Sequence, residues 1–277
     1  MIEALIDRAV DNAALLSAAQ PSIDDVLTQD AQVRSSPDGR TLGHFIVPSS
    51  RLNELATGVA VLPPSINVLL DRHLGRALEA VDDFGLVTIA SVNTPGGVNV
   101  ERGDILETLV GWSTGYGDKC DVYCEIFGPQ MRPEQVDESI RHLASIRKTQ
   151  KNFGAKIPIR NAPTEMIARV FAECSRHGVP FKLGAGETRA LGVRGILNLI
   201  AAAAIAFRDC DARGAIKDAL EDQDATAFTI DDDALVWRER RFGEATIASA
   251  RRELLIAFAA FDPAQPAAQL REAGFFV

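Results

Sequence analysis

Three charged residues lie in apolar segments that otherwise have the composition of buried strands. Glu125 belongs to DVYCEIFG, Arg160 to AKIPIRN and Lys182 to VPFKLGAG. A charge inside a buried strand is costly unless the side chain reaches an opening where water or a ligand meets it. We therefore expect these three side chains to form a functional site. The alternative is an internal ion network in which they only neutralise one another.

Lys182 allows the most specific chemistry. Apolar surroundings and the like charge of Arg160 would disfavour its ammonium form, so its amine could attack a carbonyl and form a Schiff base. In this lyase-like or aldolase-like version, Glu125 would be the acid/base and Arg160 would bind a carboxylate or phosphate. In the simpler version, Lys182 stays protonated and is a second anchor for an anion.

Residues near these strand ends offer further ligand contacts. Gly184 and Gly186 would let backbone amides approach an anion, and Arg189 adds a guanidinium. The alternative for the glycines is that they only let the chain turn sharply. Asp71 and Asn93 end two earlier apolar segments and could face the same space.

The familiar metal and nucleophile patterns do not occur. The four histidines lack metal-ligand spacing, the four cysteines complete no zinc pattern, and there is no GxSxG. We expect the thiols to be reduced and mostly buried. We predict no metal site, and the cofactor is unknown.

Short apolar runs alternate with helix-period runs along most of the chain, which indicates βαβ units and a parallel sheet. Eight such repeats predict a (β/α)8 TIM-type barrel, with an open doubly wound sheet as the second choice. In such a barrel, the ligand site lies where the strands end. The predicted strands are 44–48, 65–71, 86–93, 121–128, 155–161, 179–186, 227–230 and 254–261.

The domain prediction is a single domain over 1–277. Within it, 1–40 form an N-terminal helical extension, an amphipathic helix (MIEALIDRAVDNAALL) followed by a polar segment, and 41–277 form the barrel.

Composition restricts the partners. The net charge is −9, and no basic run with interleaved aromatic residues occurs, so we expect no nucleic-acid binding. The most apolar run, GILNLIAAAAIAF, is too short to span a bilayer and predicts a buried helix. We expect a cytoplasmic protein with no membrane partner and a small, anionic ligand. A homo-oligomer is left open.

The strand motifs resemble those of an uncharacterised bacterial family of predicted TIM-barrel proteins. The resemblance rests on AKIPIR, VPFKLGAG, GILN, FIVPSSRLNEL and AFTIDDDALVW, which cover most of the chain. It implies a barrel with a common site at Arg160 and Lys182, but no known reaction. The family's His-His pair is replaced here by ETR (187–189), and its Gly-Gly after the arginine by Asn161-Ala162.

A second similarity concerns Lys182 alone. Class I aldolases of the deoxyribose-phosphate type have a lysine on barrel strand six, followed by small residues and a glycine, and KLGAG has that outline. Two functions follow as expectations. One is an enzyme acting on a small anionic or carbonyl-containing metabolite through Lys182. The other is a non-catalytic barrel that binds a ligand or acts as a scaffold.

Overall fold

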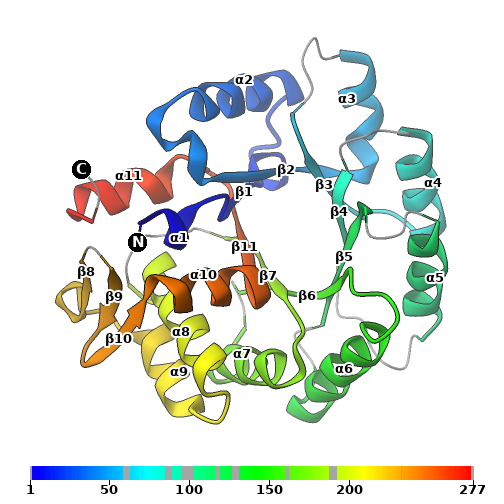
Figure 1. Ribbon diagram of the computed structural model, residues 1–277. Helices are drawn as coiled ribbons and strands as arrows, with labels where there is room; N and C mark the ends of the chain where they lie inside the picture. Colours follow the sequence, from blue (N-terminus) through cyan, green and yellow to red (C-terminus); the bar gives the residue numbers. More distant parts are fainter. Residues whose placement is uncertain are drawn as a thin grey trace.

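Eight parallel strands close into a barrel, which confirms the predicted fold class (Figure 1). The structure, a computed structural model, describes residues 2–58, 63–84, 89–94, 103–115, 119–126, 131–159, 162–186, 192–231 and 233–275. Around the barrel the strand order is β1, β11, β7, β6, β5, β4, β3, β2. The barrel strands are β1 (Val10–Asn12), β2 (Leu42–Pro48), β3 (Ile66–Leu69), β4 (Ile89–Asn93), β5 (Asp121–Glu125), β6 (Phe153–Ile157), β7 (Phe181–Gly186) and β11 (Leu255–Ala260).

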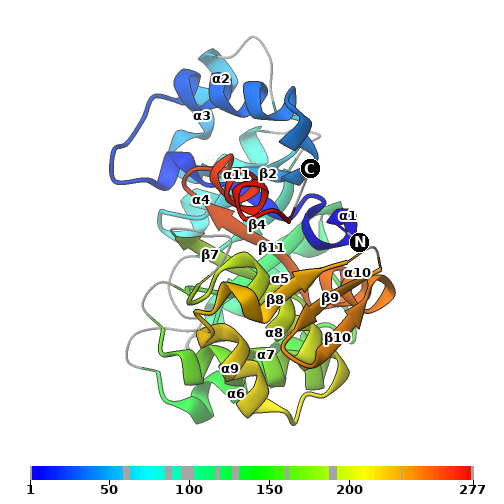
Figure 2. The same cartoon turned by 90° about the vertical axis from the view of Figure 1, so that its left-hand side faces the viewer.

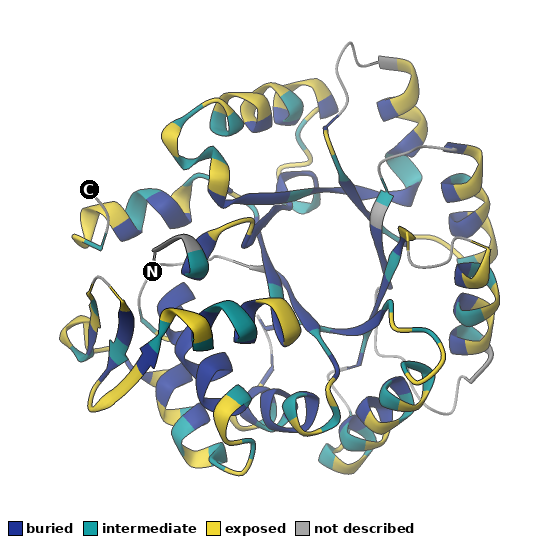
Figure 3. Ribbon diagram, viewed as in Figure 1, coloured by how far each residue is buried: buried dark blue, intermediate teal, exposed yellow. Residues whose placement is uncertain are grey.

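Helices surround the barrel and bury one side of themselves against it, while their outer sides stay exposed (Figure 3). Across the described residues, no helix combines the length and the apolar composition that crossing a bilayer requires. The α-helices are α1 (Ile2–Ile6), α2 (Ile23–Arg34), α3 (Leu52–Gly58), α4 (Leu74–Phe84), α5 (Gly103–Thr114), α6 (Pro133–Ile146), α7 (Thr164–His177), α8 (Ile196–Arg208), α9 (Arg213–Glu221), α10 (Glu244–Glu253) and α11 (Gln265–Glu272). Short 3-10 helices are η1 (Ala14–Leu16), η2 (Pro37–Thr41), η3 (Ser49–Arg51) and η6 (Ala225–Ala227).

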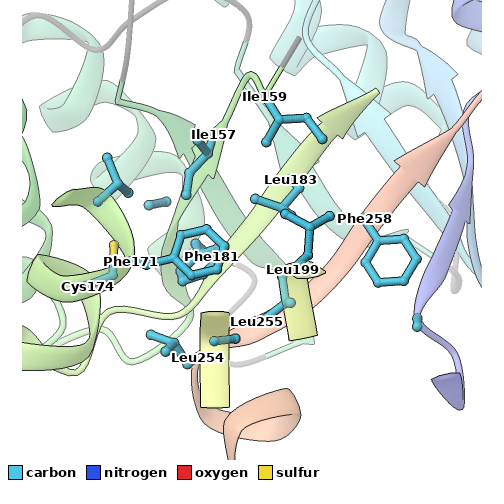
Figure 4. Packing of buried hydrophobic residues seen from close by; sticks show 14 of the residues in the cluster. Ile157, Ile159, Phe171, Cys174, Phe181, Leu183, Leu199, Leu254, Leu255 and Phe258 are labelled. Atoms are coloured by element: carbon cyan, nitrogen blue, oxygen red, sulfur yellow. The ribbon is translucent and has the colours of Figure 1, made fainter. Parts of the chain in front are cut away.

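The main hydrophobic core lies between the barrel strands and the helices. Figure 4 shows one part of it, where Phe181 and Leu183 of β7 pack beside Phe258 of β11 and Phe171 of α7. The rings of Phe171 and Phe181 are 4.6 Å apart. Because successive strand residues point to opposite sides, the residues between these outward ones point into the barrel. Lys182 is one of them.

The apolar run predicted to be a buried helix is α8. Ile196 to Ala206 are all buried in it. Its alanines allow close packing on several sides at once, since α7, α9 and α10 all contact α8. The neighbouring helix α7 ends at Gly178, which takes a left-handed φ of 63°.

The predicted N-terminal extension is wrong in one respect that matters for the site. Val10–Asn12 form barrel strand β1, which pairs with β11 and with β2. The barrel therefore includes part of 1–40, and its first βα unit is completed by α2, within the predicted polar segment.

The predicted seventh strand is also wrong. Phe228–Ile230 form β8, which belongs to a separate antiparallel sheet with β9 (Ala234–Trp237) and β10 (Arg240–Gly243). This small sheet lies outside the barrel (Figure 1). The barrel nevertheless has the predicted eight strands. β1, which was not predicted, is a barrel strand, and β8, which was predicted to be one, is not.

Candidate active site inside the barrel

Lys182 is the second residue of β7 and reaches into the barrel interior. Its Nζ lies 3.4 Å from Asp11 Oδ2 and 3.2 Å from Ser91 Oγ. It also lies 4.6 Å from the centre of the Tyr123 ring, on its face. Only 5% of Lys182 is exposed. The sequence predicted an inward lysine beside Arg160, but the charged partner that the structure gives is the carboxylate of Asp11.

Asp11 is the centre of a buried polar cluster. Its Oδ2 accepts a 2.6 Å hydrogen bond from Asn67 Nδ2, and its Oδ1 accepts one of 2.8 Å from the backbone N–H of His44. The Ser91 hydroxyl in turn donates to Asn67 Oδ1. We call Asp11, Asn67, Ser91 and Lys182 the interior network. Its members come from β1, β3, β4 and β7, so the network connects strands on different sides of the barrel.

Glu125 pairs with a lysine that the sequence reasoning overlooked. Lys156 of β6 places its Nζ 3.1 Å from Glu125 Oε2, and about 15% of each side chain is exposed. The same amine lies 3.4 Å from the backbone oxygen of Thr94, whose hydroxyl accepts from the Glu125 backbone N–H. Lys156 is opposite both Glu125 and Lys182 in the strand registers. Two lysines therefore lie next to each other on neighbouring strands.

A pocket opens above these side chains at the C-terminal mouth, the end of the barrel where the strands end. Lys156 and Lys182 both line it, together with Asp11, Asn93 and Gly184. Leu16, Ile46, Leu69, Leu183 and Ala259 complete the wall. The pocket volume is about 40 Å³. This volume exceeds what one water needs, so the pocket admits a few atoms of a ligand.

The other predicted site residues have different positions. Asn93 is buried at the end of β4 and lines the pocket, as does Gly184. Gly186 ends β7, where it pairs with Ala260 of β11. Arg160 and Arg189 lie outside the described residues, so their predicted roles stay predictions.

Asp71 holds a turn together. Its Oδ1 accepts 2.7 and 2.9 Å hydrogen bonds from Ser49 Oγ and the Ser50 backbone N–H, and its Oδ2 accepts one from Ser50 Oγ. Burial alone would raise the pKa of Asp71, but the hydrogen bonds from Ser50 and Ser49 outweigh it and lower that pKa. Both the backbone N–H and the hydroxyl of Ser50 thus bind Asp71.

Beneath Lys182, the ring of Tyr123 fills the barrel. Burial, helped by the nearby carboxylates of Asp121 and Asp11, raises the pKa of Tyr123 well above its ordinary value, so the phenol is neutral. The ring fits because residue 154 is glycine. A Cβ there would lie 2.6 Å from Tyr123 Cε1 and 2.8 Å from the Pro180 carbonyl oxygen.

We expect Gly154→Ala to lower the free energy of unfolding by about 1–3 kcal/mol, because the added methyl overpacks the barrel against the Tyr123 ring. The measurement is urea unfolding followed by circular dichroism. The matched control is Gly111→Ala in α5, where nothing lies within 4 Å of the added Cβ and alanine favours the helix. Equal stabilities of the two variants would contradict the packing role of Gly154.

The cysteines take no part in this site. All four are free thiols, as expected, and Cys120, Cys124 and Cys174 are buried. Burial raises the pKa of each of these three thiols, which makes them poor nucleophiles.

Asp11, Asn67 and Ser91 were not predicted as site residues.

No group of three or more His, Cys, Asp or Glu side chains suited to a metal occurs in the part of the chain that the structure describes. No protein-family model, curated protein or solved structure matches the chain.

Proposed function

We propose that this protein is an enzyme that acts on a small carbonyl-containing anion at the C-terminal mouth, with Lys182 as the nucleophile. The observation that carries the proposal is the pocket shared by Lys156 and Lys182 at the end of the barrel where such folds place their chemistry. Because fold alone does not fix function, the proposal rests on these side chains. The small pocket volume favours a substrate that inserts only its reactive end.

The contacts of Lys182 suit a nucleophile that must be held in place. Asp11 and Ser91 fix the direction of the amine, and Asp11 is close enough to accept a proton from it. The neutral amine would add to the substrate carbonyl, and loss of water from the carbinolamine would give the Schiff base.

Lys156 and Glu125 would act on the same substrate from the neighbouring strands. The Lys156 ammonium supplies a positive charge for the substrate anion and a proton for the departing hydroxyl. Glu125, 3.1 Å from that amine, would take up a proton from solvent and pass it to the neutral Lys156 amine, which restores the ammonium. Glu125 keeps its predicted acid/base role in this scheme, but it works through Lys156.

The similarity to class I aldolases needs a correction in strand number. Because β1 precedes β2, Lys182 is on the seventh barrel strand, and the lysine on the sixth is Lys156. The two amines are therefore separate candidates for the nucleophile, and an experiment must distinguish them.

A second candidate function is a barrel that binds an anion without chemistry. One observation favours it: Lys182 is nearly sealed, and Asp11, Ser91 and the Tyr123 ring surround its amine. A lysine so well partnered can anchor the barrel interior or an anion without taking part in any reaction.

Borohydride trapping tests the proposal. The protein is incubated with a panel of small aldehydes and 2-keto acids, reduced, digested and mapped by mass spectrometry. We expect a reduced adduct on Lys182 in the wild-type protein and none in Lys182→Met. Lys217→Met, which changes a surface lysine on α9, is the matched control and should keep the adduct.

The location of the adduct decides between the candidates. An adduct on Lys156 alone would overturn Lys182 as the nucleophile. Labelling spread over surface lysines, or no adduct on either pocket lysine across the panel, would remove the Schiff-base enzyme. The peptide map of the wild-type protein gives this answer even if Lys182→Met folds poorly.

A further inference from the structure

A second pocket lies at the opposite end of the barrel, where the strands begin. It is bordered by α1 and α10, which sit at that end in Figure 2, while β11 points away from them. Its volume is about 720 Å³, within the usual range of small-molecule sites. Four arginines line this N-terminal pocket: Arg8, Arg40, Arg251 and Arg252. Two carboxylates, Asp7 and Glu244, line it as well.

Arg251 is the deepest of these cations. It is 9% exposed, and its Nη1 donates a 2.6 Å hydrogen bond to the Leu255 carbonyl oxygen. Its buried Nε has no hydrogen-bond partner in the described part of the protein. A buried guanidinium with an unsatisfied N–H is costly unless something else occupies the site.

The lowered pKa of Arg251 also indicates a poorly compensated charge. Burial lowers the pKa of this guanidinium to about 10, and the charges of Asp11 and Asp7 only partly oppose that effect. The side chain nevertheless remains a cation at neutral pH. Within the described residues, this buried cation has no carboxylate at ion-pair distance.

Arg8 supplies a second cation. Within the described residues, no carboxylate makes an ion pair with its guanidinium, whereas Arg252 at the rim is paired with Glu253 at 2.7 Å. The Arg8 backbone N–H donates to the Arg40 carbonyl oxygen at 2.9 Å, which brings these two pocket residues together. The pocket thus offers two arginine charges, on Arg8 and Arg251, that no described carboxylate neutralises by direct pairing.

We propose that the N-terminal pocket binds a small dianion of the phosphate-monoester class. Two unneutralised guanidinium groups match a ligand with a charge near −2, and the forked donors of arginine suit phosphate oxygens. A monocarboxylate would satisfy only one of them. No described residue lines both this pocket and the one at Lys182, so the site goes beyond the proposed enzymatic reaction.

Isothermal titration calorimetry tests the proposal with three ligands: glycerol 3-phosphate, inorganic phosphate and acetate. We expect both phosphates to bind and acetate, a monocarboxylate, to bind more weakly. Arg8→Gln should weaken glycerol 3-phosphate binding about tenfold or more, the loss expected for one charged hydrogen bond. Arg251→Lys, which keeps the charge but loses the fork, should also weaken it. Arg76→Gln, on the exposed surface of α4, is the matched control and should have no effect.

Several results would overturn the site. One is that no ligand gives a heat of binding beyond that of a chloride control. Another is an equal loss of binding in Arg8→Gln and Arg76→Gln. The last is a loss of binding in Lys182→Met but not in Arg8→Gln. The last result would place the anion at the C-terminal mouth. Circular dichroism of each variant separates lost binding from lost folding, and Arg8→Gln carries the test if Arg251→Lys unfolds.

Discussion

Asp11→Ala is expected to lower the free energy of unfolding by about 3–5 kcal/mol, the usual cost of removing one partner from a buried ion pair. The variant leaves the Lys182 ammonium inside the barrel without its carboxylate. It also leaves the Asn67 amide and the His44 backbone N–H without their acceptor. Urea unfolding followed by circular dichroism measures the loss.

Two further variants define the cause. Asp218→Ala removes an exposed carboxylate from α9 and should change stability by less than about 0.5 kcal/mol. The double variant Asp11→Ala/Lys182→Met removes both charges and should recover part of the loss, giving a favourable coupling energy between the two sites. If Asp11→Ala costs no more than Asp218→Ala, the interior network is not an ion pair that supports the barrel.

Most of the barrel could be predicted because its strands follow a simple rule. Segments such as FKLGAG and FGAKI are short, apolar and bounded by turn residues, as parallel strands buried on both sides are. The helices between them repeat their apolar residues with helical spacing, as the buried residues of α6 and α7 do.

The strand β1 could not be predicted by the same rule. It has only three residues, VDN, and two of them are polar: Asp11 belongs to the interior network, whereas Asn12 donates a hydrogen bond to Asp30 of α2. The apolar residues on either side of it, from Leu5 to Leu15, fit helical spacing. Pairing with β11 and β2, which lie far along the chain, is what makes these residues a strand.

Only some of the site residues could be predicted, for a related reason. The rule that a charged residue in a buried strand points inward identified Glu125 and Lys182, and it applies equally to Lys156, although only Arg160 was predicted as a site residue from that segment. Asp11 carries no such signal, because its strand was not recognised. Asn67 and Ser91 are small polar residues, and only their contacts with Asp11 and Lys182 give them a role.

One residue, His44, contacts both the interior network and the N-terminal pocket. His44 lines the N-terminal pocket, while its backbone N–H donates a hydrogen bond to Asp11, the partner of Lys182. Gly43 beside it lets the chain approach this closely, since a Cβ there would lie 2.5 Å from Asp11 Oδ1. His44 thus connects the interior network to the N-terminal pocket.

His44 predicts a loss of stability in acid. Burial lowers the pKa of this imidazole to about 4, against the opposing charge of Asp11 and with help from Lys182, Arg8 and Arg34. The unfolded chain takes up this proton near pH 6.5, whereas the folded protein resists it until about pH 4. The unfolded state therefore binds more protons between these values, and stability falls as the pH decreases through that window.

The expected size of this effect is about 3 kcal/mol between pH 7.5 and pH 4, since each unit of pKa shift corresponds to about 1.4 kcal/mol. Urea unfolding of the wild-type protein and of His44→Gln across that range isolates it from the titration of carboxylates, which both proteins share. His44→Gln should lose about 3 kcal/mol less than the wild type on acidification. His73→Gln, at an exposed position before α4, should follow the wild-type curve. Parallel curves for the wild type and His44→Gln would mean that the folded protein accommodates the charged imidazole, and that the N-terminal pocket is more polar around His44 than its buried setting indicates.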